Sequence, residues 1–341
     1  MGYPGAQPMN TIYITDHGVS LKKKSERMAI KKGNKIVEEI PLFDVKRVLI
    51  FGNNHISTDL LRYLSEKGID VSFLSIRQRF QFRLVSETSK NIYLRMAQHR
   101  CYNNPEFRKN WSQKIVTAKI RNQKNLLLRI LRKRSQSNIR EHIDILDKCM
   151  AKVETFDAID EIMGVEGYAA ATYYAAFGQL ILKGFSFTKR QYYPPPDPVN
   201  AMLSFGYMLI CNELSALLEA SGFDIFLGFL HSIKYGRASL ATDLMEEFRS
   251  PIVDRLVLYL INLNVVHEEQ FQPKPDGKGI IMNEDSKHNY LSNYEKFMTT
   301  SFIDYRSRNR TTFRQIFKEQ VRQLEKCLLS DEHYEPFIFY E

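Results

Sequence analysis

The residue types best suited to chemistry are concentrated in residues 228–249, GFLHSIKYGRASLATDLMEEFR. His231 ends an apolar run, and a helix predicted to begin at Ser239 carries Asp243, Glu246 and Glu247. Residues three and four apart share one helical face, so Asp243 can present its carboxylate beside Glu246 or Glu247. A histidine that faces two carboxylates is typical of a metal site.

A simpler interpretation of this segment is structural. Acidic residues early in a helix are favoured by the helix dipole and by the unpaired N–H groups there, and a lone histidine is more often a hydrogen-bonded core residue than a ligand. Glu166, in GVEG, is a third candidate that helix capping does not explain. The glycine- and alanine-rich sequence after it predicts a buried helix, with Glu166 at its head. A buried carboxylate needs compensation, which a bound cation would supply.

Composition and charge narrow the class of protein. The chain has 341 residues, 44% hydrophobic and 26% charged, which is typical of a globular protein of about two domains. An excess of 48 Lys and Arg over 39 Asp and Glu favours a polyanionic partner, nucleic acid before a membrane surface. The four cysteines lie far apart, which fits a reducing cytosol and argues against a zinc knuckle or a disulfide scaffold. The longest apolar runs fall short of the roughly 18 to 20 residues of a membrane span.

Hydrophobic patterning predicts an α+β protein in two parts. We expect residues 1–8 to be a leader and residues 9–85 to be a small β-rich domain with one helix, which Ser57 caps and Gly68 closes. The polar residues 86–91 are the predicted linker, and residues 92–341 are the predicted helical domain.

Within the second part, helices are predicted over residues 92–101, 105–133, 141–160, 198–222, 252–265, 290–300 and 310–329, and residues 151–163 are amphipathic. Asp197 and Pro198 are the expected N-cap and first residue of the fourth of these helices. Ser250 and Pro251 are expected to break one helix and start another. The segment 267–287 reads as a loop or a small hairpin, and YEPFIFY closes the chain as a packing tail.

The long helix at residues 105–133 carries a sustained positive charge. No Asp or Glu occurs between Glu106 and Glu141, whereas Lys114, Arg121 and Lys124 are among many basic residues there. A surface of one sign over many turns is suited to a phosphate backbone. The alternative is a solvated face balanced by the acidic helix that follows.

Taken without any family, Glu166, His231 and Glu246, with Asp243 one turn before Glu246, offer carboxylate oxygens and one imidazole. This set suits Mg²⁺ or Mn²⁺, and the imidazole favours manganese or zinc over magnesium. A hard cation beside a basic surface indicates chemistry on phosphodiesters. The attacking group is either water, which gives a nuclease, or a DNA 3′-hydroxyl, which gives a strand-transfer enzyme. Spacing alone does not separate the two.

These motifs carry a resemblance that covers nearly the whole chain from Met9. The segments GVEG, PPPDPVNAMLSFGYMLI, GFLH and SLATDLMEEFR, in this order, behind TIYITDHGVSL, IPLFDVKRVLIFGNNHIS and GIDVSFLS, resemble the Cas-one family of CRISPR-associated endonucleases and integrases. RQRF at residues 77–80 departs from the glycine turn that the family commonly has after FLS.

The resemblance implies an N-terminal β-sandwich-like domain, a larger all-α catalytic domain, and a cytoplasmic, prokaryotic homodimer joined through its N-terminal domains. It implies Mg²⁺ or Mn²⁺ at Glu166, His231 and Glu246, with Asp243 as the nearby second carboxylate, and it favours Glu246 over Glu247. Arg249 either pairs with Glu246 or contacts the scissile phosphate.

The implied reaction inserts short DNA fragments as spacers into a CRISPR array by 3′-hydroxyl transesterification, with a dimer of Cas-two as partner and no membrane. Two alternatives stay open at this point. One is a nuclease of branched or single-stranded DNA that does not integrate, and the other is a nucleic-acid-binding scaffold without turnover.

Overall fold

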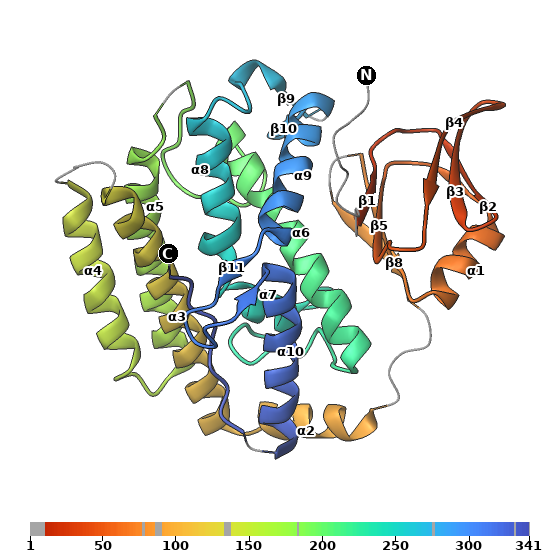
Figure 1. Ribbon diagram of the computed structural model, residues 1–341. Coiled ribbons are helices and arrows are strands. Elements are labelled where there is room, and N and C mark those ends of the chain that lie inside the picture. The colour runs from red at the N-terminus through yellow and green to blue at the C-terminus, as the bar shows by residue number, and fades with distance from the viewer. Residues whose placement is uncertain are drawn as a thin grey trace. The chain divides into compact units, whose positions relative to one another are not determined.

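The computed structural model describes residues 11–76, 79–85, 91–132, 138–182, 184–274, 277–330 and 332–340 (Figure 1). The chain divides into two compact units, Met1–Thr88 and Ser89–Glu341, and this division falls within the predicted linker. The predicted leader, most of that linker and the first two residues of RQRF lie outside the described residues.

The described residues of the first unit form two four-stranded sheets and one helix. One sheet has the order β1-β5-β7-β8, with β8 antiparallel to its neighbour, and the other has the order β4-β3-β2-β6. The elements are β1 (Thr11–Ile14), β2 (Ser20–Lys24), β3 (Arg27–Lys32), β4 (Lys35–Pro41), β5 (Arg47–Phe51), β6 (His55–Ile56), α1 (Thr58–Glu66), β7 (Asp70–Leu74) and β8 (Phe80–Leu84).

A single hydrophobic cluster unites these two sheets. Ile14 and Val48 of the first sheet, Leu21 and Met28 of the second, and Leu60 of α1 are all buried in it. Ser57 caps α1 by accepting a hydrogen bond from the backbone of the residue three positions later, as predicted. β2 and β6 were not predicted, because the lysine-rich SLKKK has only one buried residue and β6 is only two residues long.

The second unit is mostly helical, which confirms the α+β class, but it is not all-α. It contains two short antiparallel hairpins, β9–β10 within the segment 267–287 and the unpredicted β11–β12. Its elements are α2 (Ile92–Tyr102), α3 (Pro105–Leu131), α4 (Asn138–Val153), α5 (Ile159–Gln179), α6 (Pro198–Ser221), α7 (Ser239–Met245), η1 (Arg249–Asp254), α8 (Arg255–Asn262), η2 (Glu268–Gln270), β9 (Phe271–Pro273), β10 (Ile280–Met282), α9 (Glu284–Thr299), β11 (Phe302–Ile303), β12 (Arg310–Thr311) and α10 (Phe313–Ser330).

Helix α6 is the core of this unit. It begins at the predicted Asp197 and Pro198 and ends at Gly222, whose φ of 104° is left-handed. Among the described residues α6 alone is long and apolar enough to cross a membrane, but most of it is buried inside the protein, and a core helix passes the same test. The helices α3, α4 and α5 pack side by side against one another, and α7, η1 and α10 pack against α6 (Figure 1).

Two predictions about α4 and α5 were wrong. The predicted helix over residues 141–160 is divided, because α4 ends at Val153 and α5 begins at Ile159, so Glu166 lies inside α5 and not at its head. The glycine-rich part of α5 is also not buried: Tyr168 is 60% exposed, and a Cβ added at Gly167 would meet nothing within 4 Å.

Ser250 and Pro251 do not break the helical path. They lie inside the π-helical segment η1, which begins at Arg249 and runs directly into α8. A π-helical turn widens the spacing of backbone hydrogen bonds, which accommodates a proline without a stop. The three- and four-residue helical spacing that the sequence analysis assumed around Glu246 therefore does not hold there, because α7 ends at Met245 and η1 begins at Arg249.

Candidate active site

Asp243 is the organising residue of the 228–249 segment. Its fully buried carboxylate accepts hydrogen bonds from three successive backbone N–H groups, those of Phe229 (2.6 Å), Leu230 (3.0 Å) and His231 (3.1 Å). Successive N–H groups of this kind form a concave anion-binding site. Gly228 is required here, because a Cβ at this position would lie 2.8 Å from Asp243 Oδ2. These three backbone hydrogen bonds therefore fix the Asp243 carboxylate beside His231.

The same carboxylate fixes the imidazole of His231. Asp243 Oδ1 lies 2.6 Å from His231 Nδ1, and a carboxylate can only accept, so Nδ1 carries the proton. In the neutral form of this tautomer, the other ring nitrogen, Nε2, carries the lone pair. A carboxylate behind a histidine in this way is the usual arrangement that orients a metal ligand. Asp243 is thus placed as a positioning residue behind His231, and not as a second carboxylate beside Glu246.

Glu166 and Glu246 are brought together by a lysine. Lys119 of α3 pairs with Glu166 of α5, and its Nζ lies 2.6 Å from Oε2 of Glu246 at the end of α7. Arg249 Nε lies 2.9 Å from the same Glu246 oxygen. Burial alone would raise the pKa of Glu246, but Arg249, Lys119 and His231, in that order, lower it to about 2. The Glu246 carboxylate is therefore ionised although it is buried.

Glu246 Oε2 is buried and lies 2.6 Å from Lys119 Nζ and 2.9 Å from Arg249 Nε. A buried, ionised carboxylate oxygen is a suitable ligand for a hard divalent cation. With Glu166 and His231 Nε2 nearby, the donor set fits a hard divalent ion. Among the described residues, however, no three His, Cys, Asp or Glu side chains already gather at metal-binding range. The structure brings Glu166 and Glu246 together on Lys119, and His231 is near enough to act electrostatically on Glu246.

Glu247 points the opposite way. Its buried carboxylate accepts hydrogen bonds from the Tyr334 hydroxyl, from Phe337 N (2.6 Å) and from Gln320 Nε2 (2.9 Å). Burial raises the pKa of Glu247 to about 7, against the effect of these hydrogen bonds. This residue fixes the C-terminal tail, so the structure places Glu246, and not Glu247, at the candidate metal site.

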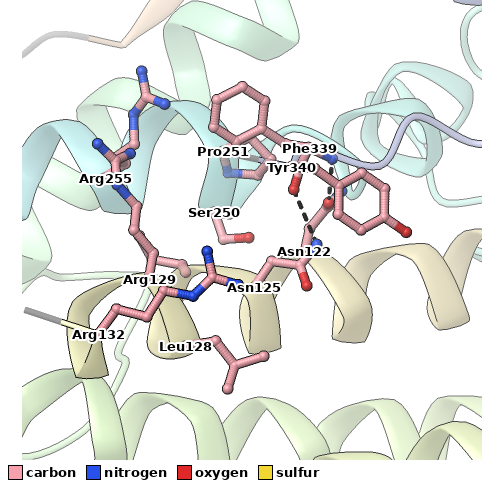
Figure 2. A pocket seen from close by; sticks show the side chains of 11 residues that line it. Asn122, Asn125, Leu128, Arg129, Arg132, Ser250, Pro251, Arg255, Phe339 and Tyr340 are labelled. Atoms are coloured by element: carbon pink, nitrogen blue, oxygen red, sulfur yellow. Dashed lines mark hydrogen bonds between the residues drawn. The ribbon is translucent and has the colours of Figure 1, made fainter. Parts of the chain in front are cut away.

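The C-terminal tail is also fixed by α3. Asn122 accepts a hydrogen bond from Phe339 N (2.8 Å), and Asn125 donates one to Phe339 O (2.9 Å), as Figure 2 shows. A small cavity of about 60 Å³ lies beside these contacts, with Arg129, Arg132 and Arg255 among its lining residues. The tail thus packs as predicted from YEPFIFY, through specific polar contacts as well as aromatic ones.

Behind the carboxylates, Arg249 is fixed by Tyr207. The guanidinium of Arg249 lies 4.4 Å from the ring centre of Tyr207, and Arg190 lies 5.4 Å from the same ring. The Tyr207 hydroxyl donates to the buried Asp254, and Asn200 accepts from Arg190 Nη1 at 2.8 Å. Tyr207 therefore packs against Arg249 and Arg190, and Asn200 hydrogen-bonds Arg190.

The basic residues predicted on α3 fall into two groups. Lys114 and Arg121 line a groove of about 640 Å³ between α3 and the C-terminal tail. Lys124 is instead paired with Asp147 of α4 at 2.5 Å. The acidic helix therefore balances part of the run. Arg121 is exposed, whereas Lys114 is partly buried and donates to Tyr334 O of the C-terminal tail at 3.3 Å.

Comparison with known proteins is decisive at this point. Residues 12–296 match the family described as CRISPR associated protein Cas1. The chain belongs to the Cas1 family. It is 33% identical to the CRISPR-associated endonuclease Cas1 2 of Rhodospirillum rubrum, over 84% of this chain and 86% of that protein. It is 31% identical to Cas1 3 of Thermus thermophilus, over 98% of both chains. The resemblance noted from the sequence motifs is confirmed.

Solved structures agree on the fold. A Cas1 protein from Thermotoga maritima superposes with a TM-score of 0.80 at 26% identity, covering 98% of this chain and all of that chain. A casposase bound to integration product superposes with a TM-score of 0.83 at 22% identity, over 96% of this chain and 93% of that one. The α+β architecture is therefore that of Cas1 proteins.

In this Cas1 chain, Lys119 is the functional candidate that the sequence did not single out. It was one of many basic residues on α3, yet it lies on a helical stripe with the buried Trp111, Ile115 and Leu126. A lysine on an apolar stripe is seldom buried unless it is paired. Its position on this stripe is the feature of the sequence that indicates a buried, paired lysine. The sequence does not show that Glu166 and Glu246 are its partners, because both are distant in the chain.

Proposed function

We propose that this protein inserts short DNA fragments as new spacers into a CRISPR array, with Mg²⁺ or Mn²⁺ held by Glu166, His231 and Glu246. The single observation that carries the proposal is the convergence of two carboxylates, from α5 and from the end of α7, on one cation beside an oriented histidine. Helix capping explains neither carboxylate, since Glu166 lies within α5 and Glu246 at the C-terminal end of α7.

The metal, when bound, would withdraw charge from the scissile phosphate and favour in-line attack by the fragment's 3′-hydroxyl. The chain's own residues would do the rest. Asp243 keeps the His231 ring in one tautomer and orientation. Arg249, stacked on Tyr207, holds a positive charge beside Glu246, where developing charge on a phosphoryl oxygen would be stabilised.

The same proposal covers the binding of DNA. Lys114 and Arg121 line the groove along α3, and their cations suit phosphate contacts that position a strand without reading its sequence. Lys124, already paired with Asp147, would add less. Arg249 is the fourth candidate contact, at the carboxylates themselves.

The assembly that we propose is a homodimer joined by the N-terminal units, which acts with a Cas2 dimer in the prokaryotic cytoplasm without a membrane. The exposed Phe43, Phe80 and Phe82 of the first unit offer apolar surface for such a contact. The shared fold with a casposase bound to integration product and with the Cas1 portion of a Cas6-RT-Cas1–Cas2 complex supports the choice of DNA and Cas2 as partners.

The test is an integration assay with the protein, its Cas2, a supercoiled plasmid and a short duplex. Duplexes with free 3′-hydroxyls should yield joined products, and duplexes whose 3′ ends are blocked should yield none. Joining that is indifferent to the 3′ end would contradict transesterification. Cleavage without joining would identify a nuclease, in which water replaces the 3′-hydroxyl.

A matched pair of variants separates catalysis from DNA binding. Glu166→Gln and Glu246→Gln should abolish joining while leaving DNA retention close to that of the wild type. If both variants join DNA at the wild-type rate, the carboxylates are structural and their assignment to catalysis fails. If the wild-type protein retains DNA but neither joins nor cleaves it, the protein is a nucleic-acid-binding scaffold.

A further inference from the structure

Lys119 occupies the position between the two carboxylates that a divalent ion would use. Its side chain is 7% exposed, it pairs with Glu166, and its Nζ lies 2.6 Å from Glu246 Oε2. We propose that Lys119 is a built-in competitor of the metal: its ammonium holds Glu166 and Glu246 together in the metal-free protein and is displaced when a divalent ion binds both. This inference rests on the metal site of the proposed function.

The local charges show why the two cations exclude each other. Lys119 and Arg249 carry two positive charges, and Glu166 and Glu246 carry two negative ones, so the buried cluster is neutral without a metal. A divalent ion added to this cluster would leave two uncompensated positive charges in a buried place, which is strongly unfavourable. Moving the Lys119 ammonium out of the cluster halves that excess, whereas Arg249 is held in place by its stacking on Tyr207.

The distances in the site also show that the Lys119 ammonium and a divalent ion exclude each other. A hard divalent ion lies roughly 2.0 to 2.6 Å from its carboxylate oxygens. An ammonium 2.6 Å from Glu246 Oε2, and paired at the same time with Glu166, fills the space in which such an ion would contact both residues.

Lys119 also stabilises the metal-free protein. Without Lys119, two carboxylates from different helices would face each other with Arg249 and, at Glu246, His231 left to offset their charge. The carboxylates raise the pKa of Lys119 even though burial lowers it, so the lysine is a permanent cation in this state. Lys119 therefore stabilises the empty site and weakens metal binding, two effects of opposite sign from one side chain.

The experiment measures the Kd of Mn²⁺ by calorimetry, without DNA, for the wild type and for Lys119→Met, Lys119→Arg and Lys124→Met. Because apparent affinity is reduced by the fraction of molecules in which the site is closed, Lys119→Met should bind Mn²⁺ about tenfold more tightly or better. Lys119→Arg keeps the charge, and Lys124→Met removes a charge on the same helix that pairs with Asp147. Both should stay within about twofold of the wild type.

Thermal unfolding supplies the second readout. In chelator, Lys119→Met should unfold at a lower temperature than the wild type, and saturating Mn²⁺ should raise its Tm by more than it raises that of the wild type. A merely structural lysine would give the lower Tm but no gain in Mn²⁺ affinity.

The outcomes distinguish this inference from the proposed function. Equal or weaker Mn²⁺ binding by Lys119→Met, with the wild type binding normally, would overturn the competition and leave the metal site standing. If the wild type bound no Mn²⁺ and joined DNA without any divalent ion, the metal part of the proposed function would fail and the inference with it.

Discussion

Glu247 gives the sharpest mutational prediction, because its neighbour Glu246 has the opposite role. Glu247→Ala removes the acceptor of the Phe337 N–H (2.6 Å) and of the Tyr334 hydroxyl, both buried, whereas the Gln320 amide keeps another acceptor in Glu335 O (3.0 Å). An unsatisfied buried donor costs about 1–3 kcal/mol, so two of them should lower the free energy of unfolding by about 2–6 kcal/mol. Glu247→Gln retains a carbonyl oxygen for Phe337 and should cost about 1–2 kcal/mol.

Urea unfolding measures these losses, and Mn²⁺ calorimetry shows which of the two glutamates is the ligand. Glu247→Gln should keep the Kd of Mn²⁺ within about threefold of the wild type. Glu246→Gln removes a ligand of the ion and should weaken Mn²⁺ binding by more than the roughly 10- to 100-fold that is typical when a residue that only orients a ligand is lost. A loss below about 1 kcal/mol for Glu247→Ala would refute the role of Glu247 in fixing the tail. Equal weakening of Mn²⁺ binding by the two Gln variants would refute the assignment of Glu246.

Three further predictions follow from the site and the surfaces. Asp243→Asn releases the His231 ring and should weaken Mn²⁺ binding about 10- to 100-fold, and an unchanged Kd would contradict the positioning role. Lys114→Gln and Arg121→Gln should each lower the salt dependence of DNA binding by about one in the log–log slope, and slopes equal to that of the wild type would exclude the groove as the path of the strand. Phe82→Glu, on the edge strand β8 with Phe82 56% exposed, should convert a dimer into a monomer in light scattering, and a persistent dimer would place the contact elsewhere.

The sequence predicted the elements that carry strong local signals. The cap at Ser57, the start of α6 at Asp197 and Pro198, and the start of α7 at Ser239 are all present. Each of these depends on residues only a few positions apart. The segment with His231 and Asp243 was also correctly identified as one unit, although the three N–H groups that hold Asp243 were not foreseen, because they require the loop conformation at Gly228.

Long-range relations could not be predicted in the same way. Glu166 was selected as the buried head of a helix, but it lies within α5 and is partly exposed, and its real distinction is the pairing with Lys119 from another helix. The choice between Glu246 and Glu247 also depended on geometry: α7 ends at Met245 and η1 begins at Arg249, so regular helical spacing does not apply between them. Family register favoured Glu246, and the contacts of Glu247 with the C-terminal tail supply the physical reason.

The most direct test of the account is anomalous diffraction at the manganese edge from crystals of the protein soaked with Mn²⁺. We predict one strong peak roughly 2 Å from carboxylate oxygens of Glu166 and Glu246 and from His231 Nε2, with the Lys119 ammonium moved away from both glutamates. A fully occupied Mn²⁺ peak elsewhere in the molecule, with Lys119 still between the two carboxylates, would contradict the account.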